Sequence, residues 1–135
     1  MSDYEFVRRI LWENVPEVRS AIVDIEDEQR EFEEAYPEAV GSGVSIYSIA
    51  SDAFIADALA PLLRSDEWDE GLACRCSKVI DSLLSFGGEE VRQMVSIRIT
   101  DYILGWGYWS RFQECAGPAL QAEVNRRKHY YLAPD

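Results

Sequence analysis

The stretch DEWDEGLACRCSKVIDSLLSFGGEEVRQMVSIRITDYILGW, residues 66–106, decides the fold because it holds two helical patterns joined by two glycines. On each side of Gly87-Gly88, apolar residues recur at steps of three and four, the spacing of one helix face. The first set is Trp68, Leu72, Cys76, Val79, Ile80, Leu83 and Leu84, and the second is Val91, Met94, Val95, Ile99, Tyr102, Ile103 and Trp106. The pattern predicts an antiparallel helix hairpin that buries both faces on each other, with the remaining chain packed around it.

Two helices are expected before this hairpin, up to the loop that begins at Pro37. Ser2 or Asp3 is a good N-cap for the first. Asn14 is expected to cap the second, with Pro16 just inside its start.

A third helix is expected to follow Ser45, and Pro61 should bend or end it because proline lacks the amide that a helix interior uses. Ser65 or Asp66 is then expected to cap the first helix of the hairpin. A short helix over residues 108–115 and a last one from Ala119 to about Tyr130 complete the chain.

No segment shows the alternation of a half-buried strand, so we predict an all-α fold. Residues 1–135 are expected to form a single helical domain with six or seven helices. Short loops allow either a compact bundle or a short, solenoid-like stack of hairpins.

The charge of the chain is strongly acidic and uneven. The formal net charge is −12, and residues 1–70 hold 18 acidic and 5 basic side chains, against 7 and 8 in residues 71–135. Such an excess disfavours nucleic acid or an anionic membrane as a partner. It favours a basic protein partner, or it serves solubility alone.

The sequence indicates a cytoplasmic protein. The first residues, MSDYEFVRR, carry acids where a signal peptide has bases, and no uninterrupted apolar run is long enough to span a membrane. Three cysteines, an odd number, agree with a reducing compartment.

The acidic stretch from Asp24 to Glu38 is the first candidate site, with eight acids and one base. Several acids stand three or four positions apart, so like charges lie beside one another on a helix and cost a few tenths of a kcal/mol per pair. A docking surface for a basic partner explains this arrangement, and so does a merely solvated face. The residues predicted to contact a partner here are Asp24, Asp27, Glu28, Glu31 and Glu34.

A second acidic cluster opens the hairpin and consists of Asp66, Glu67, Asp69 and Glu70. Acids in a first turn complement the helix dipole, which explains the cluster without any partner. We expect it to extend the acidic surface if the fold brings it beside the earlier helix.

The aromatic run from Trp106 to Phe112 has two interpretations. Aromatic residues at a helix joint usually pack, and the glycines let the backbone turn. The alternative is a surface that contacts a small ligand or substrate.

Motifs for other chemistry are missing from the sequence. His129 is the one histidine and has no glutamate three residues before it, so neither a di-iron pattern nor a zinc set is present, and we expect no metal and no cofactor. No Gly-x-Ser-x-Gly elbow or phosphate-cradling glycine loop occurs, so no catalytic residue is assigned.

The segment Gly87-Gly88-Glu89-Glu90-Val91-Arg92, continued to Tyr102, resembles a turn of small bacterial all-helical, HEAT-like domains of uncharacterised function. Several proteins of that kind are similar to immunity proteins of bacterial toxin systems. The resemblance covers roughly residues 45–105. It implies a HEAT-like helical fold and a cognate protein toxin as the partner.

Together these features predict a non-enzymatic immunity protein that neutralises a cognate bacterial toxin, a basic nuclease-type protein, through its acidic surface. A DNA-mimic inhibitor of a nucleic-acid-binding protein is the alternative from the same charge pattern. An enzyme or ligand binder that uses the aromatic run is the third.

Overall fold

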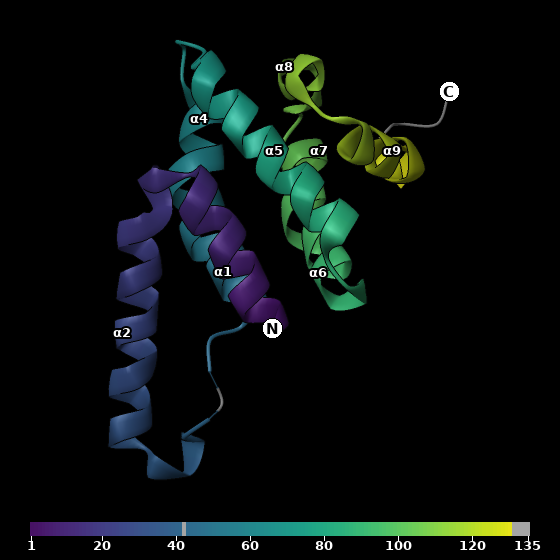
Figure 1. Ribbon diagram of the computed structural model, residues 1–135. Helices are drawn as coiled ribbons and strands as arrows, with labels where there is room; N and C mark the ends of the chain where they lie inside the picture. The colour runs from purple at the N-terminus through teal and green to yellow at the C-terminus, as the bar shows by residue number, and fades with distance from the viewer. Residues whose placement is uncertain (42, 131–135) are drawn as a thin grey trace.

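The structure, a computed structural model, describes residues 1–41 and 43–130, and within them it is helical without strands (Figure 1). The first elements are α1 (Asp3–Asn14), a 3₁₀ turn (Pro16–Val18), α2 (Arg19–Ala35) and a second 3₁₀ turn (Pro37–Ala39). A long third helix combines α3 (Ile46–Ile49), a π-helical stretch (Ala50–Leu59) and α4 (Ala60–Arg64). The hairpin consists of α5 (Glu70–Phe86), then α6 (Glu89–Met94), a π-helical stretch (Val95–Thr100) and α7 (Asp101–Gly105). The chain ends in α8 (Trp109–Phe112), a 3₁₀ turn (Gln113–Cys115), α9 (Pro118–Arg127) and a last 3₁₀ turn (Lys128–Tyr130).

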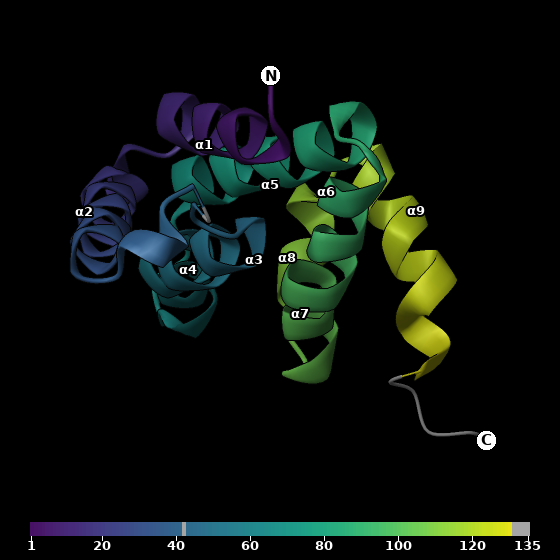
Figure 2. The ribbon, with the colours of Figure 1, turned by 90° about the horizontal axis from the view of Figure 1, so that it is seen from below.

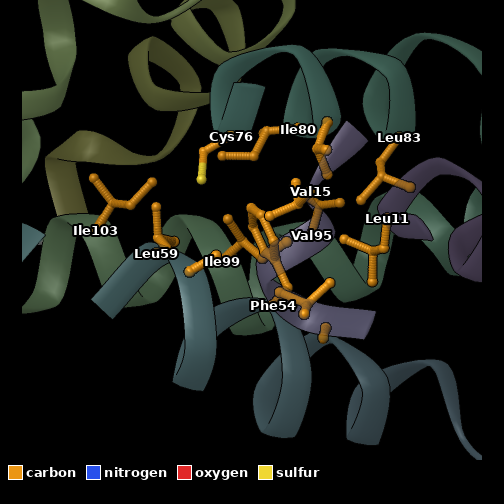
Figure 3. Packing of buried hydrophobic residues seen from close by; sticks show 14 of the residues in the cluster. Leu11, Val15, Phe54, Leu59, Cys76, Ile80, Leu83, Val95, Ile99 and Ile103 are labelled. Atoms are coloured by element: carbon orange, nitrogen blue, oxygen red, sulfur yellow. The ribbon is translucent and has the colours of Figure 1, made fainter. Parts of the chain in front are cut away.

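When contiguous turns are joined, the described residues form seven helices, as predicted. The buried side chains of most of these helices form one core cluster. Of the two predicted arrangements, a compact bundle and a solenoid-like stack, the fold is therefore the compact one. In Figure 3, Phe54 of the third helix lies among Leu11 of α1 and Val95 and Ile99 of the hairpin. The third helix is thus as central as the hairpin and does not merely cover it.

The hairpin turn is built around Gly87. A Cβ atom there would lie 2.6 Å from Cγ1 of Val91 and would also collide with the carbonyl oxygen of Leu83. Arg92 closes the turn, since its Nη1 donates to the Gly87 carbonyl oxygen at 2.7 Å. Gly87, Val91 and Arg92 therefore shape this turn.

Of the two outcomes expected at Pro61, a bend or an end, the end does not occur, and the helix continues to Arg64. Just before the proline, the amide of Ala60 bonds to the carbonyl oxygen of Ile55, one residue further back than in an α-helix. The wider turn of the π-helical stretch leaves room for the Pro61 ring. In an α-helix this ring would clash with the backbone carbonyl group four residues earlier.

Two predicted N-caps were wrong. Asn14 donates its side-chain amide to the Ile10 carbonyl oxygen at 2.8 Å, and Val15 takes the cap position before Pro16. Asp69, and neither Ser65 nor Asp66, caps α5 by accepting from the Leu72 amide at 3.0 Å. Ser2 caps α1 as predicted.

The third helix is also the one helix among the described residues that is long and apolar enough to cross a membrane by length and composition. Its 19 residues, Ile46–Arg64, have a window of mean hydropathy 1.4, half of which is buried in the fold. Ile49, Phe54 and Leu59 are fully buried there. The apolar character of this helix is accounted for by its place in the core.

Candidate partner-binding surface

The inner stripe of α2 leaves the core halfway along the helix. Ile22 is fully buried, Ile25 is half-buried, and Phe32 and Tyr36 are 48% and 52% exposed. Figure 1 shows the cause, because α2 stands at one side of the molecule and extends past the ends of its neighbours. The apolar stripe of α2 is therefore covered only over its first half.

The five acids predicted on α2 lie on or beside its solvent face. Four of them, Asp24, Glu28, Glu31 and Glu34, are exposed, and Asp27 is half-buried. Asp27 forms an ion pair with Arg30, one turn further along the same helix. The structure thus leaves a row of carboxylates on a protruding helix.

Two other acids of α2 have structural roles. The Glu26 carboxylate accepts from Tyr4 Oη at 2.7 Å and from Arg8 Nε at 2.8 Å, which ties α2 to α1. Partial burial opposes ionisation of Glu26, but these hydrogen bonds outweigh it and hold its pKa below the ordinary value. Glu33 Oε1 accepts from the amides of Gly41 and Gly43, at 3.0 and 3.5 Å, and so holds the following loop against the helix.

A groove of about 460 Å³ separates the second half of α2 from the start of the third helix. On the α2 side it is lined by Ile25, Glu28 and Phe32, and on the opposite side by Val44, Ser48 and Asp52. Both sides therefore combine an apolar side chain with an exposed carboxylate. The phenyl ring of Phe32 also contacts that of Tyr36, with ring centroids 5.0 Å apart.

The second acidic cluster is exposed but lies elsewhere. Asp66, Glu67, Asp69 and Glu70 are in or next to the loop between α4 and α5, at the end of the molecule opposite the free end of α2 (Figure 1). Asp69 caps α5, and Glu70 accepts from Trp68 Nε1 at 3.1 Å. The two acidic clusters therefore do not merge into one patch. Two of the four acids in the second cluster, Asp69 and Glu70, make these local hydrogen bonds.

The aromatic run is divided between packing and solvent. Phe112 is fully buried, and Tyr108 and Trp109 pack against the core. Arg111 holds α8 against the end of α4. Its Nη1 donates to the Leu63 carbonyl oxygen at 2.8 Å, and its guanidinium lies over the Trp68 ring. Trp106, predicted in the buried face of the hairpin, is 67% exposed because its helix ends at Gly105.

Two of the three cysteines are held in environments that disfavour the reactive thiolate. Burial raises the pKa of the Cys76 thiol to about 12 and that of Cys115 to about 11, so both remain protonated at neutral pH. In the described part of the chain, no group of three or more histidine, cysteine or carboxylate side chains is arranged to hold a metal ion.

The feature that sequence reasoning missed is the exposure of Phe32 and Tyr36. Their spacing from Ile25 is that of a buried helix face, and the only sequence signal against burial is the dense acidity around them. Searches of protein-family models, curated proteins and solved structures found no match to this chain.

Proposed function

We propose that this protein is a non-enzymatic immunity protein that binds and neutralises a cognate, basic bacterial toxin in the cytoplasm. The observation that carries the proposal is the row of exposed carboxylates on a helix that projects from the core. A charged face in such a position is accessible to a large partner and is not needed to hold the fold together.

The physical basis is electrostatic complementarity. A toxin that cleaves nucleic acid has a basic surface, because it must bind phosphates. Asp24, Glu28, Glu31 and Glu34 supply negative charge to the same kind of surface and speed the encounter with it. Association should weaken as salt rises, since exposed charges are screened.

The same row of charges supports the alternative of a DNA-mimic inhibitor. A mimic presents charge alone to many proteins that bind DNA, whereas the groove beside α2 adds apolar side chains that phosphates lack. The apolar component favours one specific protein partner and ranks the immunity proposal first.

Capture of partners from the native host tests the two proposals, with the neighbouring open reading frames sequenced alongside. The immunity proposal predicts one stoichiometric basic partner encoded next to this gene. The mimicry proposal predicts several nucleic-acid-binding proteins that duplex DNA displaces. Capture of no basic protein at all would contradict both.

A charge-reversal variant assigns the binding to α2. Lysine at Asp24, Asp27, Glu28, Glu31 and Glu34 should abolish capture of the partner, while the helical circular-dichroism signal and Tm remain nearly unchanged. The matched control carries lysine at five exposed acids of other segments, Glu5, Glu13, Asp57, Glu90 and Glu114. Equal capture by the wild type and the α2 variant overturns the assignment.

A further inference from the structure

The second half of α2 presents an apolar stripe without a neighbouring helix to cover it. Beyond Ile25, the positions that continue the buried face are Gln29, Phe32 and Tyr36, and the two aromatic rings are about half exposed. A large ring costs free energy when it remains in water, so a pair of them on a protruding helix is typical of an interaction site.

The groove beside these rings has the shape and chemistry for a cationic, amphipathic segment. Its volume of about 460 Å³ falls within the range of roughly 300–1,000 Å³ in which proteins hold ligand groups. Phe32 and Val44 offer apolar contact from opposite sides, and the Glu28 and Asp52 carboxylates flank them.

The far side of the groove is held in place before any partner binds. Ser48 and Asp52 stand on the third helix, and Val44 follows a loop in which the amides of Gly41 and Gly43 both donate to the Glu33 carboxylate. A preformed groove lowers the ordering cost of binding.

We propose that this groove is the specificity site of the acidic surface, and that it receives an arginine- or lysine-rich segment of the partner protein with a bulky apolar side chain. That apolar side chain inserts between Phe32 and Val44, and the flanking cations pair with Glu28 and Asp52. The inference rests on the proposed function and adds to it the kind of segment that the partner presents.

Charge complementarity selects this occupant over a second copy of the chain. The net charge is −12, and residues 24–38 hold eight acids against one base, so two such faces would repel each other. The basic residues Arg126 and Arg127 of α9 are already paired with Glu123 and Asp101.

Three synthetic 14-residue helical peptides test the proposal by titration into the full-length ¹⁵N-labelled protein. One peptide has arginines with two tryptophans four positions apart, the second has alanine in place of tryptophan, and the third has glutamine in place of arginine. We expect the arginine–tryptophan peptide to bind at least tenfold more tightly than either of the others, with amide shifts concentrated at Gly43 and Val44.

The variant Phe32→Gln/Tyr36→Gln should abolish the advantage of tryptophan over alanine. Both side chains are half exposed, so the fold should survive the change. Phe86→Gln is the matched control, because this ring is 78% exposed at the end of α5, away from α2. It should leave the advantage intact.

The outcomes separate the groove from the charge. Equal binding of the two arginine peptides to the wild type, or an advantage of tryptophan that survives in the Phe32/Tyr36 variant, overturns the groove while leaving the acidic surface as a binding site. Failure of both arginine peptides to bind overturns the acidic surface as well. Self-association that the Phe32/Tyr36 variant loses would assign the stripe to a second copy and also overturn the proposal.

Discussion

At the residue scale, acids close together on α2 have different roles because their neighbours differ. Glu26 faces Tyr4 and Arg8 of α1, whereas Glu28 and Glu31 face solvent. Sequence alone treats these carboxylates alike, since the pattern of acids does not show which one meets an arginine from another helix.

The substitution Glu26→Gln should lower the free energy of unfolding at pH 7 by about 1 kcal/mol, since it weakens three hydrogen bonds to a half-buried ionised group. The pKa of Glu26 is lower in the folded protein than its ordinary 4.5. Its contribution is therefore fully present above pH 4.5 and is lost as the pH falls through the folded-state pKa.

Urea titrations of both proteins between pH 7 and pH 3 measure this effect. The difference between the wild type and Glu26→Gln should shrink below pH 4.5. A difference that stays constant over that range would show that the carboxylate charge does not stabilise the contact between α1 and α2.

Gly87→Ala should destabilise the protein by about 1–3 kcal/mol, because the added methyl group would overlap Val91 and the Leu83 carbonyl group. The matched control is Gly88→Ala, where the nearest atom to the new methyl would be Oδ1 of Asp3 at 3.9 Å. That change should cost less than about 1 kcal/mol, as expected for an N-cap glycine. Thermal unfolding that gives equal losses for the two variants contradicts this account of the turn.

At the element scale, the structure of α9 depends on a residue far away in sequence. This helix was expected from Ala119, and it begins one residue earlier, at Pro118. Its cap, however, comes from α5, since Asp81 Oδ1 accepts from the Leu120 amide at 3.0 Å. Gly117 leaves room for this carboxylate, with which any Cβ atom would collide.

Asp81→Ala should cost about 1 kcal/mol of stability, as the loss of an N-cap does, while Asp81→Asn keeps an acceptor oxygen and should cost clearly less. Hydrogen exchange of the Leu120 amide should rise in the alanine variant. Identical stability and exchange in the two variants would mean that Asp81 does not cap α9.

The elements that were predicted from sequence are those with strong local patterns. The apolar periodicity of residues 66–106 gave both helices of the hairpin and the turn at Gly87-Gly88, and Ser2 gave the first cap. The π-helical stretch before Pro61, the cap from Asp81 and the exposure of Trp106 depend on tertiary contacts or exact helix ends, which local pattern does not encode.

The candidate site was predicted in composition but not in arrangement. The five acids of α2 lie on or near its outer face, whereas Asp66 and Glu67 lie at the other end of the molecule. The sequence identified which side chains carry charge. It did not show that α2 extends beyond the core. The exposure of Phe32 and Tyr36 and the groove beside them were therefore not predicted.

At the scale of the whole molecule, charge is separated across the fold. In Figure 2, α2 lies at one edge and α9 at the other, so the acidic helix and the arginines near the C-terminus are on opposite sides. A basic partner should therefore approach from the α2 side, oriented by the field of the protein.

The most direct measurement of the central claim is growth rescue in a bacterial host that expresses the captured basic partner. The wild type and the variant with lysine at Glu5, Glu13, Asp57, Glu90 and Glu114 should restore growth. The variant with lysine at Asp24, Asp27, Glu28, Glu31 and Glu34 should fail, although it folds and accumulates equally. Full rescue by that α2 variant would contradict the claim that this acidic helix neutralises the toxin.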